Sequence, residues 1–427
     1  MPTHSTEPAG FRDSAPGGVS SPDHAPPAPT DDPAVSERWP LLDRIAHTLG
    51  RRLVDGHSLG LEVGGDGFVE GFRLELEQPE GGTQQQVVYL ETRPESVQRD
   101  GVLSLRDVDG TSVAVWLYPR DPELPALPAA VYPESAAGLL ANMGVLCREL
   151  TLSLIAYRPG KRAVVRAEAE GVDAFLKVFA PRSTAALVEK YTTWHESGLP
   201  TPRLLGWSDR GLIAFAALPG ATAAASLDRI DDHDRFLDEI VALQRAIAAV
   251  PSAQLARPSL ATRVDWYEQR LAALMPEHSA SIGSVGQVVA RTLAATPAAL
   301  PVTVHGDLHI GQVFIDGRGD VCGVLDIDTA GLGDPADDAA AFYAHLVVTA
   351  LYHRDQPRLA ATASELASRW IRRWPKADRS FALRAKAIAA THLLAHALSD
   401  AVPREYLLHA AGILAAELQQ EAVVQAD

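Results

Sequence analysis

The sequence is poor in cysteine, in aromatic residues and in positive charge. Its two cysteines, Cys147 and Cys322, have no neighbours at a metal-ligand spacing, so neither a disulfide framework nor a cysteine metal site is indicated. Lysine and arginine total 38 against 54 acidic residues, a formal net charge of −16, which opposes the phosphate backbone of nucleic acids. Apolar runs of membrane-spanning length and a signal-peptide core are missing. We expect a cytoplasmic protein with neither a nucleic-acid nor a membrane partner.

Apolar residues are plentiful enough for more than one core. They make up 47% of the 427 residues, and a chain of this length suggests two or three domains. The first 35 residues are rich in Pro, Gly, Ser, Ala and Asp, a composition that buries too little surface to offset chain entropy. We expect four segments: a disordered tail (1–35), a cap-like α+β domain (36–148), a strand-rich lobe (149–220) and a helical lobe (221–427).

The expected cap-like domain begins with a helix and continues with strands. Apolar residues recur at helical spacing from Trp39 to Leu53. Alternation then predicts strands at Phe72–Leu76, Val87–Leu90 and Val113–Tyr118. Prolines at positions 122, 125 and 128 mark a linker, and a helix is expected over 135–149.

The stretch from Val302 to Asp338 carries the strongest chemical signal. It predicts a strand, a polar loop, a second strand, a turn at Gly317–Asp320 and a returning strand. This hairpin brings Asp307, Gln312 and Asp326 to one place. Two carboxylates and an amide oxygen are hard donors that suit Mg²⁺ and its bound phosphates.

The residues of this stretch resemble the catalytic segment of the aminoglycoside phosphotransferase/choline kinase superfamily. That segment reads H-G-D-x-H-x-x-N, followed by I-D-[WFY], G-D-P and D-[LA]. The matching positions are His305, Gly306, Asp307, His309, Asp326, Gly333, Asp334, Pro335 and Asp338. Gln312 departs from the pattern, because most of the superfamily has Asn there. HGDLHxGQ with Gln is similar to the form in actinobacterial maltokinases and glucosamine kinases.

The resemblance implies an α+β, bilobal protein-kinase-like fold with an N-terminal α+β cap domain. It also implies Mg²⁺ and ATP, with Asp307 accepting the proton of the acceptor hydroxyl. Gln312 and Asp326 would hold Mg²⁺. Asp328, placed on the same side as Asp326 if this stretch is extended, would help the metal or reach the acceptor. Asp334 and Asp338 are expected to order the segment after Asp326.

Nucleotide-binding residues are expected in the strand-rich lobe. Lys177 lies between apolar residues in the strand 175–179, where a lysine needs a partner or ligand. The resemblance assigns it to the α- and β-phosphates; the alternative is an edge-strand lysine. Its expected partner is Glu189, with Glu196 as runner-up. Further expectations are a phosphate-covering hairpin at 158–162, an adenine-binding hinge at Ala216 and Leu218, and His309 either supporting the loop or touching the γ-phosphate.

The histidines of the C-terminal helices give a weaker signal. His392 and His396 are four residues apart and share a helix face. Zinc binding needs a third ligand that the sequence does not identify, so polar residues at the rim of a cleft are the favoured interpretation. Asp400 is a candidate contact for the acceptor.

These observations favour an ATP-dependent kinase for a small-molecule acceptor, acting as a monomer or homodimer. Glucosamine-like and maltose-like sugars lead, because of the Gln variant and the N-terminal domain. An aminoglycoside or another amino alcohol comes next. The rival of another class is a nucleotide-binding regulatory pseudokinase, against which Asp307, Asp326 and Lys177 together argue. A hydrolase is disfavoured, because the sequence lacks a nucleophile elbow.

Overall fold

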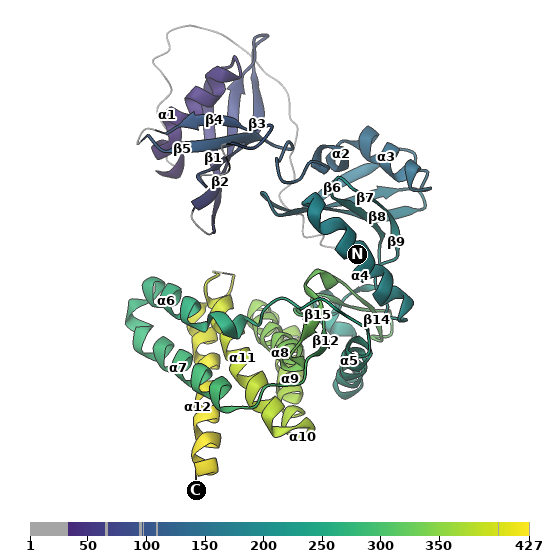
Figure 1. Ribbon diagram of the computed structural model, residues 1–427, viewed down its shortest axis with the longest axis vertical. Coiled ribbons are helices and arrows are strands. Elements are labelled where there is room, and N and C mark those ends of the chain that lie inside the picture. The colour runs from purple at the N-terminus through teal and green to yellow at the C-terminus, as the bar shows by residue number, and fades with distance from the viewer. Residues whose placement is uncertain are drawn as a thin grey trace. The chain divides into compact units, whose positions relative to one another are not determined.

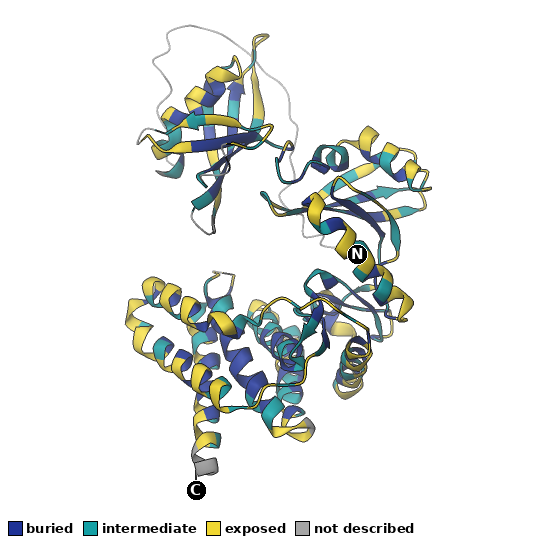
Figure 2. Ribbon diagram, in the orientation of Figure 1, coloured by how far each residue is buried: buried dark blue, intermediate teal, exposed yellow. Residues whose placement is uncertain are grey.

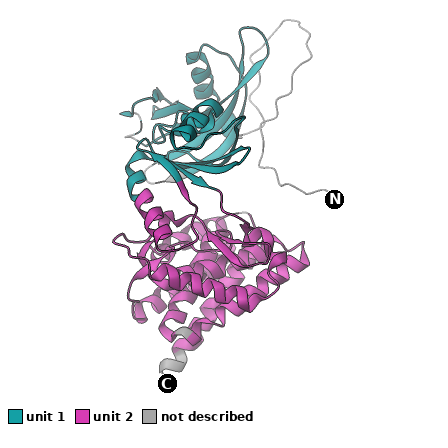
Figure 3. Ribbon diagram, turned by 90° about the vertical axis from the view of Figure 1, so that its right-hand side faces the viewer, with its two compact units in different colours: residues 1–186, 205–216 teal, residues 187–204, 217–427 magenta. Residues whose placement is uncertain are grey.

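The computed structural model describes residues 33–426, apart from 65, 66, 94, 95, 97, 108, 109 and 400 (Figure 1). Most of the predicted disordered tail therefore lies outside the described residues, as does Asp400. The chain divides into two compact units (Figure 3). Unit 1 contains residues 1–186 and 205–216, and unit 2 contains 187–204 and 217–427.

The N-terminal part of unit 1 is one helix packed on a five-stranded antiparallel sheet. The helix α1 (Pro33–Thr48) begins before the predicted start, because Val35 is buried with Leu41 and Leu42 in the core of this domain. The sheet has the order β1-β2-β3-β5-β4. Its strands are β1 (Leu53–Gly64), β2 (Gly67–Glu77), β3 (Thr83–Glu91), β4 (Leu103–Arg106) and β5 (Ser112–Leu117).

The second part of unit 1 is another five-stranded sheet, covered on one face by two short helices. The sheet order is β6-β7-β8-β10-β9. Its strands are β6 (Thr151–Arg158), β7 (Arg162–Ala169), β8 (Val172–Phe179), β9 (Leu204–Ser208) and β10 (Leu212–Ala216). The covering helices are α2 (Leu127–Val131) and α3 (Pro133–Asn142), and Leu127 and Leu140 share a core with Val165 and Leu176. The segment predicted as a linker is therefore partly helical and packs on this sheet.

The two sheets of unit 1 meet at a buried carboxylate, Asp121. Its Oδ2 accepts hydrogen bonds from Tyr157 Oη at 2.8 Å and from the backbone N–H of Gly160 at 2.7 Å. The Tyr157 ring also packs edge-on against Tyr89 of β3, with 5.4 Å between centroids. Burial raises the pKa of Asp121, and its hydrogen bonds counteract the shift. Arg158 and Lys161, in the same β6–β7 hairpin, pair with Glu62 of β1.

We predict that Asp121→Ala destabilises unit 1 by about 2–4 kcal/mol, because the Tyr157 hydroxyl and the Gly160 N–H lose their acceptor. Urea denaturation measures the effect. Asp121→Asn keeps one acceptor oxygen and is expected to lose less. Glu62→Gln, which removes the two partly exposed ion pairs with Arg158 and Lys161, is the matched control and is expected to cost under about 1 kcal/mol. An Asp121→Ala protein as stable as the wild type would contradict this account.

Unit 2 is mainly helical and contains most of α4 (Thr184–Glu196). The central helix of this unit is α11 (Arg379–Ala397), which is largely buried (Figure 2). It packs against α7 (Ser279–Ala295), α8 (Pro335–Tyr352) and α12 (Arg404–Ala426). No helix in the described part of the chain is long and apolar enough to cross a membrane. The other α-helices described in this unit are α5 (His233–Ala248), α6 (Val264–Leu274), α9 (Pro357–Ile371) and α10 (Trp374–Ala377).

Two small sheets of unit 2 carry the predicted catalytic stretch. One joins β11 (Ala221–Thr222), β13 (Val313–Ile315) and β14 (Val321–Val324), and the other joins β12 (Val302–Val304) and β15 (Gly331–Gly333). β13 and β14 form the predicted hairpin, with Val313 opposite Val324. β12 pairs with β15 instead, with Val304 opposite Gly331. The predicted elements are present, although they are divided between two sheets.

Candidate active site

The loop that follows β12 is held from beneath by Asp338, in the first turn of α8. The Asp338 carboxylate accepts the backbone N–H of His305 at 2.7 Å and that of Gly306 at 2.8 Å. Burial raises the pKa of Asp338, while His305 and these backbone donors counteract the shift. We expected Asp338 to order the segment after Asp326. Its bonds instead set the position of the loop that presents Asp307.

The loop conformation also depends on Gly306. Its φ is +80°, and a Cβ atom there would lie 2.6 Å from the carbonyl oxygen of Thr329, so a larger residue would be strained and would clash. His305 lies below the loop with its Nε2 2.7 Å from the carbonyl oxygen of Leu325, where Nε2–H donates. His305 therefore supports the loop, and position 306 needs a glycine.

Asp334 fixes the start of α8. Its Oδ1 accepts the N–H of Ala336 at 2.9 Å, as an N-cap residue does. Its Oδ2 lies 2.6 Å from Nε of Arg384, which projects from α11. Asp334 therefore orders the chain after Asp326 by starting α8, and its ion pair connects α8 to the central helix α11.

Gln312 directly precedes β13, and Asp326 follows β14 by two residues, so both lie at the open end of this hairpin. The N–H of Leu325 donates to the carbonyl oxygen of Gln312 at 2.9 Å, which extends the strand pairing to the residue before Asp326. Asp326 has φ 60° and ψ 44°, in the left-handed region. That conformation is uncommon outside glycine, although Asp tolerates it better than most residues, and it is found at functional sites.

The side-chain oxygen of Gln312 fits the role of a metal ligand. Gln312 is 7% exposed, and its Oε1 is buried with no hydrogen-bond partner among the described residues. A buried amide oxygen without a partner costs free energy unless a ligand satisfies it. No three His, Cys, Asp or Glu side chains in the described part of the chain form a metal-binding group. Mg²⁺ would therefore rely on Gln312, Asp326 and phosphate oxygens, which matches its preference for few protein ligands.

Asp328 is placed differently from our expectation. Residues Ile327–Thr329 form a 3₁₀ turn, so the assumption of an extended stretch after Asp326 is wrong. The Asp328 carboxylate accepts a hydrogen bond from Tyr191 Oη at 3.0 Å, and its carbonyl oxygen accepts one from Lys190 Nζ at 3.0 Å. These contacts connect the turn to α4. A metal or acceptor role for Asp328 stays a prediction, with a structural role beside it.

Four histidines pack beside the β12 loop: His392 is buried, whereas His309, His345 and His396 are half-buried. The rings of His309 and His345 stack with centroids 3.9 Å apart, and His396 lies edge-on to His345 at 4.5 Å. Burial lowers the pKa of His309 from 6.5 to about 4 and that of His392 to about 3, and it also lowers the pKa values of His345 and His396. These imidazoles are therefore neutral at pH 7. His392 is 4% exposed, so it is a core residue and not part of a rim.

His309 supports the loop as well as the histidine cluster. Its Nδ1 accepts the N–H of Gly311 at 3.1 Å, which leaves the proton on Nε2. Its carbonyl oxygen accepts the N–H of Gln312 at 2.9 Å. The position of the Gln312 backbone thus depends directly on His309. Contact with the γ-phosphate stays a prediction.

We predict that His392→Gln flattens the pH dependence of stability. The folded-state pKa of about 3 lies below 6.5, so the unfolded chain takes up a proton first as the pH falls. The stability that depends on neutral His392 is present above about pH 6.5. It is lost at about 1.4 kcal/mol per pH unit on acidification toward pH 3. Urea denaturation between about pH 4 and 7 measures the slope. His195→Gln, an exposed change on α4, is the control; parallel profiles for wild type and His392→Gln would contradict the prediction.

Sequence reasoning missed Arg257, which contacts the predicted catalytic carboxylate. Its guanidinium lies 3.0 Å from Asp307 Oδ1 and 3.4 Å from Oδ2, and it also donates to the carbonyl oxygen of Gly306 at 3.1 Å. Arg257 belongs to an irregular segment between α5 and α6. Neither periodicity nor a motif marks it in the sequence.

Lys177 lies on the central strand of its sheet. β8 is flanked by β7 and β10, and Lys177 is opposite Val164 on one side and Ile213 on the other. The edge-strand alternative is therefore wrong. Its Nζ lies 5.9 Å from the ring centroid of Phe215. The phosphate role of Lys177 stays a prediction, as does its pairing with Glu189, which is exposed on α4.

The structure gives the neighbours of the other residues predicted to contact the nucleotide. Ala216 ends β10, opposite Ala174. Leu218 lies against Gly323 of β14, where a Cβ atom would come within 2.8 Å of Leu218 Cδ1. In the hairpin 158–162, the N–H of Gly160 already donates to Asp121, which weakens the case for a phosphate-covering role of that amide.

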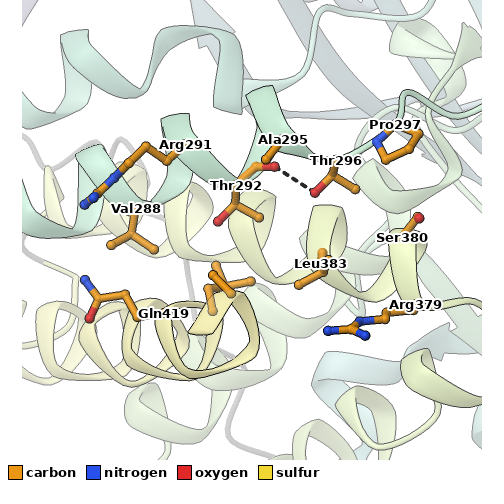
Figure 4. Close-up of a pocket in the computed structure, with 12 residues that line it drawn as sticks. Val288, Arg291, Thr292, Ala295, Thr296, Pro297, Arg379, Ser380, Leu383 and Gln419 are labelled. Carbon is orange, nitrogen blue, oxygen red and sulfur yellow. Dashed lines mark hydrogen bonds between the residues drawn. The ribbon is translucent and has the colours of Figure 1, made fainter. Parts of the chain in front are cut away.

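A separate cavity of about 550 Å³ lies among α7, α11 and α12 (Figure 4). Apolar side chains such as Val288 and Leu383 share its wall with Thr292, Arg291 and Arg379. None of the predicted site residues is among the residues that line it. The catalytic candidates are gathered instead around the β12 loop and the β13–β14 hairpin.

Comparison with known proteins agrees with this arrangement. Residues 160–378 match the model of the phosphotransferase enzyme family, which is just over half of the 427-residue chain. The chain belongs to this family and is a phosphotransferase that acts on a hydroxyl group. The predicted α+β protein-kinase-like fold is confirmed, with the N-terminal sheet as an addition. No curated protein matches the chain.

Several solved structures are similar at low identity. An aminoglycoside-3'-phosphotransferase of type VIII is 23% identical, with 57% of this chain and 94% of that chain covered and a TM-score of 0.41. An aminoglycoside phosphotransferase from Streptomyces rimosus is 21% identical, with 56% and 92% covered and a TM-score of 0.39. A spectinomycin phosphotransferase, in complex with ADP and spectinomycin, is 11% identical, with 68% and 99% covered and a TM-score of 0.45.

Proposed function

We propose that this phosphotransferase transfers the γ-phosphate of ATP to a hydroxyl group of a sugar or amino sugar. The observation that carries the proposal is the buried Oε1 of Gln312, which has no hydrogen-bond partner among the described residues. The backbone of Gln312 pairs with Leu325, the residue before the left-handed Asp326. Gln312 and Asp326 follow a loop that presents Asp307. This set combines a base for the acceptor hydroxyl with hard oxygen donors for a metal-bound nucleotide.

Asp307 is the proposed catalytic base. It orients the acceptor hydroxyl and accepts its proton while the hydroxyl oxygen attacks the γ-phosphorus. The bond from the γ-phosphorus to the bridging oxygen breaks, and ADP leaves with that electron pair. Such a transfer needs little covalent chemistry from the protein, so catalysis rests on position and charge. The two bonds from Asp338 to the loop backbone supply that positioning.

Gln312 and Asp326 are the proposed Mg²⁺ ligands, with Asp328 as a further candidate. Bound Mg²⁺ would neutralise charge on the β- and γ-phosphates. Gln is one methylene longer than the Asn that most of the superfamily has at this position. The hydrogen bonds of the Gln312 backbone to His309 and Leu325 fix where that longer side chain starts.

The nucleotide contacts that we propose are those predicted from the sequence. Lys177 would bind the α- and β-phosphates, with Glu189 as its carboxylate partner. Main-chain groups at Ala216 and Leu218 would bind adenine, and His309 would support the loop or contact the γ-phosphate. The central-strand position of Lys177 is compatible with this role, because it removes the alternative of an edge-strand lysine.

A sugar acceptor is supported by two features. The HGDLHxGQ form of the motif is similar to that of maltokinases and glucosamine kinases, and the helix-on-sheet domain before the catalytic lobes occupies the place of their cap domain. Phosphorylation of an aminoglycoside or amino alcohol is the alternative within this chemistry. A regulatory pseudokinase would bind ATP without turnover.

We predict acceptor-dependent release of ADP from Mg-ATP in the presence of glucosamine, glucose or maltose, with choline and kanamycin as the alternative acceptors. Asp307→Asn keeps the shape of the side chain but cannot accept the proton, and it is expected to lower kcat by about 10²- to 10⁴-fold. ATP binding without turnover in any of these mixtures would favour the pseudokinase. Turnover that Asp307→Asn retains would show that the base is another residue.

We also predict that Gln312→Ala raises the Mg²⁺ concentration needed for half-maximal rate by at least about tenfold, because an oxygen ligand is lost. The matched control is Gln312→Asn, which restores the amide of the superfamily pattern and is expected to retain more Mg²⁺ affinity than Ala. Rates measured over a Mg²⁺ titration give the result. Identical titrations for wild type and Gln312→Ala would remove Gln312 from the metal site.

A further inference from the structure

Arg257 is held beside the catalytic loop by backbone pairing on both sides of β15. One edge of β15 pairs with β12, which leads into Asp307. On the other edge the N–H of Leu332 donates to the carbonyl oxygen of Gln254 at 2.8 Å, and the N–H of Ala256 donates to the carbonyl oxygen of Leu332 at 3.0 Å. The N–H of Arg257 itself donates to Thr329 at 2.9 Å. Arg257 and Asp307 therefore follow two chain segments whose register is set by the same strand.

The close approach of these segments requires a glycine. A Cβ atom at Gly331 would lie 2.5 Å from the carbonyl carbon of Leu255 and 2.6 Å from the backbone nitrogen of Ala256. Only a residue without a side chain allows the segment 254–257 to run this near to β15. The position of Arg257 is thus built into the backbone.

The guanidinium of Arg257 covers both oxygens of the proposed base. It contacts Oδ1 and Oδ2 of Asp307 at 3.0 and 3.4 Å, the two-pronged geometry that favours arginine over lysine. The side chains of Arg257 and Asp307 are 35% and 27% exposed, so an acceptor can reach them. An incoming ammonium group would have to compete with this guanidinium for the same carboxylate.

The surrounding titratable groups leave the charge of Arg257 in place. His309, His345, His392 and His396 are held neutral by burial. Asp337, whose charge interacts with Arg257, is half-buried, and desolvation raises its pKa to about 7, which weakens its competition for the guanidinium. Asp326, whose charge acts on His309 together with that of Asp307, is a further carboxylate near this loop, and Arg257 is the cation in direct contact with Asp307.

We propose that Arg257 sets the charge specificity of the acceptor site, so that the protein phosphorylates an uncharged sugar and discriminates against an amino sugar. This inference rests on the sugar kinase function proposed above and narrows its acceptor class. An uncharged hydroxyl approaches Asp307 without displacing the guanidinium. An ammonium near that hydroxyl meets a fixed like charge at short range in a partly buried site, where repulsion is much stronger than in water.

The test compares glucose with glucosamine, which differ by one hydroxyl and one amino group. The ratio of kcat/KM for the two sugars is measured at saturating Mg-ATP and at about pH 6.5, where the amine carries its proton. The variants are Arg257→Gln, which removes the charge, and Arg257→Lys, which keeps the charge but loses the fork. Arg245→Gln, an exposed change on α5, controls for net charge.

The wild type is expected to favour glucose by at least about tenfold, and Arg257→Gln to reduce that preference by at least about tenfold. Arg257→Lys is expected to retain most of the preference, which a purely structural role of the arginine would not predict. Arg245→Gln is expected to leave it unchanged. If Arg257→Gln does not fold, the proposal is tested with Arg257→Lys and with a salt series on the wild type. Raising the salt from about 0.05 to 0.5 M should weaken the preference for glucose over glucosamine.

Two other outcomes separate the inference from the function on which it rests. A wild-type preference for glucosamine, or an unchanged ratio in Arg257→Gln, would overturn the role of Arg257 while leaving the sugar kinase in place. A salt-independent preference that Arg257→Lys loses would do the same. If neither sugar, nor maltose, stimulates ADP release, the proposed function itself is overturned.

Discussion

A buried carboxylate, Asp338, is the constraint on which the catalytic loop depends. Its oxygens accept the N–H groups of His305 and Gly306, so two hydrogen bonds join the loop after β12 to the first turn of α8. Asp334 caps that same helix and pairs with Arg384 of the central helix α11. Transferring a carboxylate from water to the protein interior costs free energy unless hydrogen bonds satisfy its oxygens. The position of Asp307 is therefore connected to the helical core of unit 2 through backbone bonds and one ion pair.

The metal side of the site has a different support, the β13–β14 hairpin. Backbone pairing from Val313 through the carbonyl of Gln312 places that residue next to Asp326. The left-handed backbone of Asp326 is a local cost that a rigid hairpin can carry. Because Asp307 depends on α8 while Gln312 and Asp326 depend on the hairpin, the proposed base and the proposed metal ligands are positioned by two separate sets of bonds. These sets meet at the hydrogen bond between His305 and Leu325.

Local patterns in the sequence predicted the parts of the site that local spacing determines. The turn and strand signals between His305 and Asp338 are present in the structure as the β13–β14 hairpin and its turn. β1 was missed, because its glycines and polar residues hide the strand alternation. Asp328 was misplaced, because a single 3₁₀ turn replaces an extended chain. Arg257 lies fifty residues before Asp307, and its contact depends on the register of an irregular segment against β15. Sequence spacing holds no information about such a tertiary pairing.

The charge around Asp307 follows from what burial does to its neighbours. Four imidazoles packed near a carboxylate would supply a strongly positive wall if they were protonated. Desolvation lowers their pKa values far enough that they stay neutral at pH 7. The packing around these histidines thus determines how much positive charge lies near Asp307. One guanidinium and one carboxylate then remain as a matched pair. An uncharged acceptor preserves that balance, whereas a cation must compete with Arg257 and an anion must compete with Asp307. The packing of α8 and α11 thus bears on acceptor choice even though their histidines make no ion pair with Asp307.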